Sequence, residues 1–190
     1  MKNKIVVGIT GASGSIYSLE LIKWLTKNGH TVELIASDTG KKVFEYETGF
    51  NFLLDAIDTD NTGLLKIHSN DDLFSPLSSG SYGFDAVIIA PCSMGTLGRL
   101  AASSGSKLIE RVCDVSLKER RRLVIMPRET PLNKIHLKNM LSIAEAGAIV
   151  VPAMPAFYHK PESLKNMIDF MVSKLLDAID MDNDLYKRWK

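Results

Sequence analysis

Cysteine and histidine are scarce in this chain, and neither is arranged to build a covalent or metal framework. The 190 residues include two cysteines, Cys92 and Cys113, and four scattered histidines. One disulfide is arithmetically possible, but the spacing fits no disulfide framework and no paired metal-ligand motif. We therefore expect reduced thiols, no metal centre and a cytoplasmic protein.

The sequence also lacks an excess of one charge and a long apolar run. Lys and Arg total 23, Asp and Glu total 22, and the net charge is +1. This balance gives no general reason to expect nucleic acid or an acidic membrane surface as a partner. The longest apolar stretch, residues 146–157, is broken by Gly147, Pro152 and Pro155 and is too short to span a bilayer. The opening segment MKNKIVVGITGASG is expected to be a first strand rather than a signal peptide.

Short apolar runs alternate with helical patterns along the chain. Strands are predicted at 4–9, 31–36, 86–90, 123–126 and 148–151. Helices are predicted at 15–27, 39–47, 93–102, 134–146 and 163–180. The polar stretch 51–82 is expected to hold little regular structure beyond a short strand at 64–68. Because the strands lack polar alternation, both of their faces should be buried. We expect one α/β domain over residues 1–190, with a doubly wound, mostly parallel sheet.

The first predicted strand runs into a glycine-rich turn, GITGASGS. Gly8, Gly11 and Gly14 recur at every third position, and a helix follows. Such a turn can bring backbone N–H groups and a helix N-terminus to a phosphate, and Ser13 adds a hydroxyl. A tight turn without a ligand is the alternative, because a glycine motif alone is weak. Short-chain dehydrogenases have similar glycines, but the Tyr-x-x-x-Lys pair that they need matches only residues 186–190, so we reject that assignment.

The second and third predicted strands also end in small polar residues. Asp38 follows the second strand, where it could bind a ribose or cap the next helix, and Ser37 could donate to a phosphate or a flavin ring. The sequence PCSMGTL follows the third strand, where Ser93 could cap a helix. Two such loops at neighbouring strand ends could hold one mononucleotide between them. Cys92 is expected to be a small buried residue rather than a nucleophile.

Charged residues surround the fourth predicted strand. Pro127, Arg128 and Glu129 follow it at once. Buried charges are costly unless they are paired or bind something. Lys118 and three arginines precede the strand, with Arg111 further upstream. Such a run is typical of a solvated helix end, although one or two cations could turn toward a phosphate. We predict an anion site with a proton-transfer group at this strand end, with a structural ion pair as the alternative.

The fifth predicted strand ends in PAMPAFYHKP, which holds three prolines and two aromatic residues. Phe157 and Tyr158 could form a rigid wall for a flat or hydrophobic ligand. Core packing explains Phe157 equally well, whereas the Tyr158 hydroxyl needs a polar partner if it is buried.

Together these segments resemble the UbiX-type flavin prenyltransferases, a branch of the homo-oligomeric flavin-containing Cys decarboxylase group. The resemblance lies in GITGASGSIY, PCSMGTL, DVSLKERRRLV, RETPL with HLKNM, GAIVVPAMPAFYHKP and LYKRW. It implies a Rossmann-like (flavodoxin-like) fold that assembles into a dodecamer. It further implies that a dimethylallyl group passes from dimethylallyl phosphate to N5 and C6 of reduced FMN without a metal. The prenylated FMN would then serve a UbiD-type decarboxylase.

The resemblance also implies roles for individual residues. The implied FMN contacts are Gly11, Ala12, Ser13, Ser37, Ser93, Met94, Gly95, Thr96 and Arg128. The implied contacts to dimethylallyl phosphate are Arg111, Lys118, Tyr158 and Lys174, with Glu47 and Trp189 completing the pocket. Ser13 and Glu129 would be the catalytic residues, with Glu129 relaying protons.

The chain departs from the family pattern in three places. Lys174 stands where many relatives carry Arg, which keeps the charge but not the bidentate geometry. Ser106-Lys107 replaces a typical Asp-Asn pair, and the stretch 51–82 matches poorly.

Two rival hypotheses belong to other classes of activity. One is an FMN-dependent decarboxylase of the same group, which typically has a catalytic His and a different loop after the third strand. The other is a flavin-binding accessory subunit of a decarboxylase complex, which would not need an alkylation site.

Overall fold

The computed structural model describes residues 2–51 and 63–188, and the strands within these ranges form one parallel sheet. They are β1 (Lys4–Ile9), β2 (Thr31–Ala36), β3 (Leu65–Ser69), β4 (Ala86–Cys92), β5 (Arg122–Pro127) and β6 (Ile149–Val150). Their order across the sheet is β3-β2-β1-β4-β5-β6, and every neighbouring pair is parallel. This is the doubly wound order of dinucleotide-binding folds, and it confirms the predicted α/β class.

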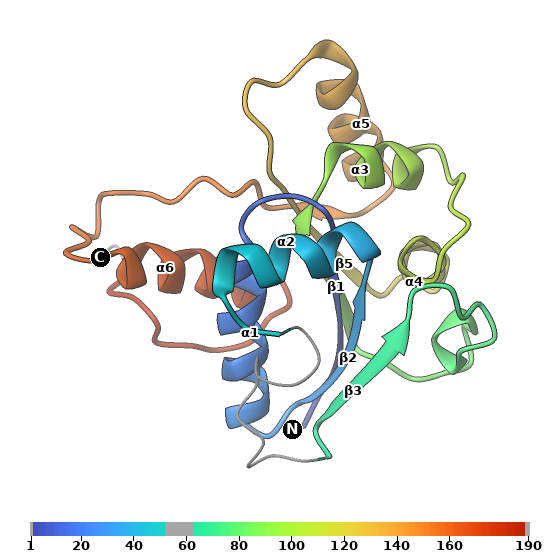
Figure 1. The fold of residues 1–190 in the computed structure, drawn as a ribbon, viewed down its shortest axis with the longest axis horizontal. Coiled ribbons are helices and arrows are strands. Elements are labelled where there is room, and N and C mark those ends of the chain that lie inside the picture. The colour runs from blue at the N-terminus through green and yellow to red at the C-terminus, as the bar shows by residue number, and fades with distance from the viewer. Residues whose placement is uncertain (1, 52–62, 189–190) are drawn as a thin grey trace.

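Helices cover both faces of this sheet. They are α1 (Ser15–Lys27), α2 (Asp38–Thr48), α3 (Met94–Ala101), α4 (Leu108–Lys118), α5 (Lys134–Glu145) and α6 (Leu164–Asp177). Helices α1 and α6 pack together on one face, while α3 packs with α4 and α5 on the other (Figure 1). A single turn of 3-10 helix, η2 (Pro76–Ser78), contacts α4. Over the described residues, every helix is too short or too polar to cross a membrane.

Two apolar clusters bury the sheet from both sides. Ile5 and Val7 of β1 belong to the cluster with α1 and α6, whereas Val6 belongs to the cluster with α3 and α4. Each buried side chain of this size contributes about 1.5–3 kcal/mol. This two-sided burial explains why the strands lack polar alternation. Because both faces of the sheet are covered, we expect a ligand at the carboxyl ends of the strands, where ligands bind in open α/β sheets.

Most predicted elements agree with the structure to within a few residues. The bounds of β1, α1 and β2 are those predicted, because a glycine-rich turn and the Asn28-Gly29 pair mark their ends sharply. The short strand predicted at 64–68 is confirmed as the edge strand β3. Residues 52–62 of the predicted irregular stretch lie outside the described part of the chain.

Helix α4 was not among the predicted helices. The sequence indicated only that the basic run 117–122 is typical of a solvated helix end. Its buried face includes Val112, Cys113 and Val115, so the apolar period is present in the sequence. Arg111 and Asp114 interrupt that period and make the segment look like a polar surface run. The omission matters, because α4 carries two of the predicted phosphate contacts.

Candidate functional site

The loops after β1 and β4 are tied together by one buried threonine. The Thr10 hydroxyl donates to the Pro91 carbonyl at 2.9 Å and accepts from the Ser93 backbone N–H at 2.7 Å. Thr10 is 1% exposed, so these bonds are shielded from water. The two small-residue loops therefore lie side by side, at the point where the strand order reverses. This is the arrangement that the sequence predicts for holding a ligand between them.

The glycine turn after β1 is closed by a carboxylate of the chain itself. Gly14 has a φ of 114°, which only glycine adopts readily, and it precedes α1 without a side-chain cap. The Glu47 carboxylate instead accepts from the Gly14 N–H at 3.0 Å and from the Ser15 N–H at 2.8 Å. The helix-terminal donors that the glycine pattern offers to a phosphate are thus occupied by Glu47.

Hydrogen bonding keeps Glu47 ionised. Partial burial acts to raise the pKa of its carboxyl, but hydrogen bonds from Ser13 and from the Ser15 and Gly14 N–H groups outweigh it. The net pKa lies below the usual glutamate value. Glu47 and Ser13, for which the family resemblance implies separate roles, are therefore in contact.

Replacing Glu47 with glutamine is expected to destabilise the fold at neutral pH by about 0.5–1 kcal/mol, because a partly solvated carboxylate leaves a helix N-terminus. In wild type, the pKa of Glu47 is lower in the folded state than its ordinary value of 4.5. The carboxylate therefore stabilises the fold above pH 4.5, and this stabilisation is lost as the pH falls through the folded-state pKa. The urea midpoint of unfolding should be lower for Glu47→Gln than for wild type at pH 7, and this difference in midpoint should vanish in acid. Glu145→Gln, at the far end of α5, is the control and should cost nothing. Equal midpoints for Glu47→Gln and wild type at pH 7 would contradict this role.

The starts of α2 and α3 are capped by the serines that the sequence singles out. Ser37 Oγ accepts from the Gly40 N–H at 3.0 Å, and Ser93 Oγ accepts from the Thr96 N–H at 3.3 Å. Asp38 is the first residue of α2 rather than its cap, and its carboxylate lies 3.6 Å from Lys41. The capping alternative for Ser93 is therefore confirmed, whereas the capping alternative for Asp38 is wrong, because Ser37 caps α2 in its place. The Ser93 hydroxyl also donates to Thr96 Oγ1 at 3.1 Å, so its proton is already used at the start of α3.

A cavity of about 210 Å³, which we call the strand-end pocket, lies beside these helix starts. The hydroxyl-bearing residues in its lining are Thr10, Ser37, Thr39 and Thr96. The charged residues in its lining are Asp38, Asp71, Arg99, Lys107 and Glu110. Two predicted FMN contacts, Ser37 and Thr96, thus share one pocket. Neither cation of this pocket was predicted, although Lys107 belongs to the Ser106-Lys107 departure from the family pattern.

Gly11 lies against the start of α2. A Cβ atom on Gly11 would lie 2.5 Å from the Thr39 side chain, so a larger residue would push the loop away from the strand-end pocket. Ala12 is buried and Ser13 is partly buried in the same loop. The three predicted contacts of this loop are therefore held against the start of α2.

Arg128 and Glu129 are exposed, which corrects the prediction of buried charges at this strand end. Strand β5 ends at Pro127, and nothing in the described part of the chain packs over the two residues that follow. The Arg128 N–H donates to the Cys92 carbonyl at 3.2 Å, which places Arg128 beside the β4 loop. The Glu129 carboxylate accepts from the Thr130 N–H at 3.0 Å, and the described residues show no ion pair between Arg128 and Glu129. The structural-pair alternative is therefore wrong.

The thiol of Cys92 does not take part in this site. Burial raises the pKa of Cys92 to about 12, so the thiol stays protonated at neutral pH. This agrees with the prediction of a small buried residue rather than a nucleophile.

Tyr158 and Lys174 come together at the α6 side of the sheet through a residue that was not predicted. The Lys174 side chain is hydrogen-bonded to Tyr186, which raises the pKa of Lys174. Burial acts to raise the pKa of Tyr186, but hydrogen bonds to Lys174 and Tyr158 lower it overall. Phe170 packs edge-on against Tyr158 and Tyr186 at centroid distances of 5.8 and 4.9 Å. Tyr186 could have been found in the LYKRW segment, but only as one aromatic residue among several.

Arg111 and Lys118 lie on α4, on the opposite face of the sheet from Tyr158 and Lys174. Arg111 Nε donates to the Ser78 carbonyl at 3.1 Å, and its NH1 group lies 2.7 Å from Asp114. Lys118 is paired with its neighbour Glu119. Within one chain, the four predicted phosphate contacts therefore form two separate pairs. Trp189 lies outside the described residues.

The serine-rich segment 78–82 wraps against the cations of α4. Its carbonyls accept from Arg111 of α4 and from Arg121, which follows the helix, and a Cβ atom on Gly80 would lie 2.7 Å from Lys118 Nζ. This segment belongs to the stretch 51–82 that is predicted to hold little regular structure. Its signal, SSGSY, is a run of small polar residues that reads as a loop unless its contact with α4 is known.

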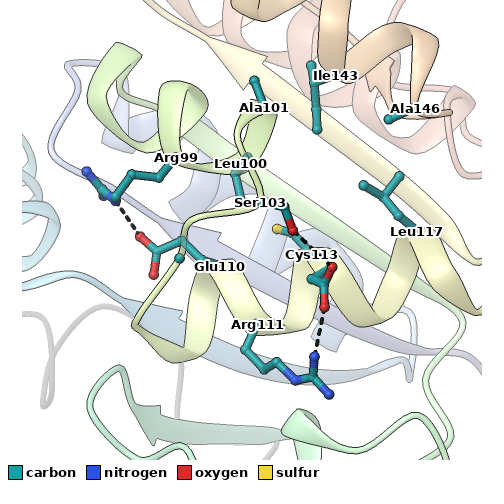
Figure 2. Close-up of a pocket in the computed structure, with 12 residues that line it drawn as sticks. Arg99, Leu100, Ala101, Ser103, Glu110, Arg111, Cys113, Leu117, Ile143 and Ala146 are labelled. Carbon is teal, nitrogen blue, oxygen red and sulfur yellow. Dashed lines mark hydrogen bonds and ion pairs between the residues drawn. The ribbon is translucent and has the colours of Figure 1, made fainter.

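A second cavity, of about 330 Å³, lies between α3, α4 and α5. Figure 2 shows Arg99 and Glu110 reaching toward each other at one end, with Leu117 and Ile143 at the other. Arg99 Nε and Glu110 Oε1 are 2.9 Å apart, and both residues also line the strand-end pocket. This ion pair therefore separates the two cavities.

Comparison with known proteins places the whole chain in one group. The family described as Flavoprotein matches residues 1–180. A curated relative from Methanocaldococcus jannaschii, Flavin prenyltransferase UbiX, is 49% identical over 190 residues, which is 98% of each chain. The crystal structure of AnUbiX (PadA1) in complex with FMN and dimethylallyl pyrophosphate superposes with a TM-score of 0.92 at 38% identity, over 100% of this chain and 98% of that one.

A third match is the dodecameric FMN-dependent UbiX-like decarboxylase from Escherichia coli O157:H7. It has a TM-score of 0.90 and 36% identity, over 98% of this chain and 99% of that one. These matches cover nearly the whole length of the chain. The chain therefore belongs to the flavoprotein family and, within it, to the UbiX flavin prenyltransferases.

Proposed function

We propose that this protein transfers the dimethylallyl group of dimethylallyl phosphate to N5 and C6 of reduced FMN and releases phosphate. The observation that carries the proposal is the full-length similarity to a UbiX structure that holds FMN and dimethylallyl pyrophosphate. The product would be passed to a UbiD-type decarboxylase. Both cysteines are free and buried, which suits the reducing conditions of the cytoplasm.

The residues at the strand ends fit a flavin mononucleotide. The glycine turn carries Glu47, so we assign the flavin phosphate to the strand-end pocket, where Ser37 and Thr96 offer hydroxyls. Ser93, with Met94 and Gly95 in the first turn of α3, would support the remainder of the flavin beside the two tied loops. Arg128, exposed beside that loop, would add a cation. Gly11, Ala12 and Ser13 would form the opposite wall.

Glu129 and Ser13 would carry the chemistry of this chain. Reduced FMN, when bound, supplies the nucleophilic atoms N5 and C6. Closure of the new ring would place one proton on the neighbouring alkene carbon of the dimethylallyl group and remove one from C6, and we assign Glu129 to relay these protons. Ser13 is held by Glu47, so its hydroxyl is oriented before any substrate arrives.

The donor phosphate would be held by cations and hydroxyls that stabilise it as it leaves. One set is Tyr158, Lys174 and Tyr186, and the other is Arg111 and Lys118. Because these sets lie on opposite faces of one chain, we propose that a neighbouring copy completes each site. A homo-oligomer, a dodecamer as in the Escherichia coli relative, would bring the α4 set of one copy to the α6 set of the next.

Anaerobic incubation with reduced FMN and dimethylallyl phosphate tests the reaction directly. We expect the flavin released from the protein to gain the mass of one dimethylallyl group less one hydrogen atom. Omission of the donor is the control. Unmodified flavin would exclude the prenyltransferase and favour a decarboxylase or a flavin-binding accessory subunit.

A further inference from the structure

The strand-end pocket has more acidic than basic side chains in its lining. It contains the carboxylates of Asp38, Asp71 and Glu110 against the cations of Arg99 and Lys107. A phosphate dianion would be repelled by this excess unless one of the cations is free to turn toward it.

The helix starts around the pocket supply little of the missing positive charge. Ser37 and Ser93 cap α2 and α3. At α4, the Leu108 N–H donates to the Asn70 carbonyl at 2.8 Å, and the Ile109 N–H donates to Asn70 Oδ1 at 3.0 Å. Several helix-terminal donors are thus already used within the chain, so side-chain cations have to provide much of the attraction for an anion.

Arg99 is the less adaptable of the two cations. Its partner Glu110 is only 5% exposed and also accepts from the Lys107 backbone N–H at 3.0 Å, which fixes the carboxylate at the start of α4. Moving Arg99 away would leave Glu110 as a buried, unpaired charge, which is costly. Arg99 also donates to Thr96 Oγ1 at 3.2 Å.

Lys107 is held more loosely. It pairs with Asp71 from the loop after β3, and the two side chains are 50% and 63% exposed. Exposed ion pairs contribute little to stability, so this one can be exchanged for a better partner. The hydrogen bond and charge of Asp71 raise the pKa of Lys107, which is therefore fully charged at neutral pH.

We propose that Lys107 is a specificity-determining residue for FMN in this chain, released from Asp71 to bind the flavin phosphate in the strand-end pocket. The inference rests on the proposed function only in taking FMN as the ligand. Asp71 then has two opposing effects. It keeps the Lys107 side chain at the pocket, and it competes with the phosphate for the same ammonium group.

The two members of the pair are expected to have opposite effects on FMN affinity. Lys107→Gln should weaken FMN binding about tenfold, because a charge-assisted hydrogen bond is lost. Asp71→Asn should tighten FMN binding about threefold, because it frees Lys107 and removes a negative charge. Neither change should alter the affinity for riboflavin, which has the same ring system but no phosphate. Dissociation constants from flavin fluorescence quenching would measure both ligands.

A matched ion pair elsewhere provides the control. Lys165 and Asp169 form a salt bridge of 2.8 Å on α6, away from the strand-end pocket. Lys165→Gln and Asp169→Asn should leave both flavin affinities unchanged. The salt dependence of FMN binding should also become shallower in Lys107→Gln, since a phosphate contact is lost.

The outcomes separate this inference from the proposed function. If both variants weaken FMN and riboflavin alike, the ion pair is structural and the inference is overturned. It is also overturned if neither variant changes FMN affinity, or if wild type binds FMN no better than riboflavin. The prenylation assay does not depend on the relative affinities for FMN and riboflavin. An unmodified flavin would contradict the proposed reaction, but the affinity measurements on the Lys107 variants would remain valid.

Discussion

Glu129→Gln is expected to bind FMN with wild-type affinity and to lose turnover by about 10²–10⁴-fold, the range that a positioned acid–base group contributes. Glutamine has nearly the same shape and can still accept the Thr130 N–H through its carbonyl oxygen. It cannot take up or release a proton. The exposed carboxylate makes no ion pair with Arg128, so its loss should change the melting temperature little.

Two measurements on Glu129→Gln separate a catalytic role from a structural one. FMN binding and thermal melting report the site and the fold, and the mass of the released flavin after a single turnover reports the chemistry. Glu162→Gln, at an exposed position before α6, is the control and should retain wild-type rates. Wild-type turnover in Glu129→Gln would remove this residue from the mechanism.

The sequence predicts the sheet well because burial on two faces leaves a clear signature. Strands such as 4–9 and 31–36 are apolar throughout and are bounded by glycine or polar turns, so their type and ends follow from local rules. The prediction that two loops meet at the strand ends follows from the parallel topology, and Thr10 confirms it. The position of Arg128 and Glu129 at the end of a strand was predictable in the same way.

Contacts between residues that are distant in sequence were beyond local rules. Glu47 lies more than thirty residues from the glycine turn that it closes. Lys107 and Asp71 meet across the strand-end pocket only because Asn70 joins the β3 loop to the start of α4. The exposure of Arg128 and Glu129 depends on what packs over the strand end, which no periodicity in the sequence reports.

Mixing two inactive variants is expected to restore activity if each site uses α4 from one copy and α6 from another. Arg111→Ala and Lys174→Ala should each lower turnover by about 10²–10³-fold, because each removes a cation from the leaving phosphate. Co-assembly of equal amounts should return about a quarter of wild-type activity. That fraction follows because a site is intact only when both of its contributing chains are unmutated at the positions it uses.

A second mixture makes this test specific to the shared site. Arg111 and Lys118 both lie on α4, so a mixed oligomer of Arg111→Ala and Lys118→Ala contains no site with both cations and should stay inactive. If Arg111→Ala with Lys174→Ala were equally inactive, both sets would have to come from the same copy. One chain would then need to bring α4 and α6 together around an edge of the sheet that separates them. The two apolar clusters hold these helices on opposite faces, so completion by a second copy is the arrangement that leaves the packed core intact.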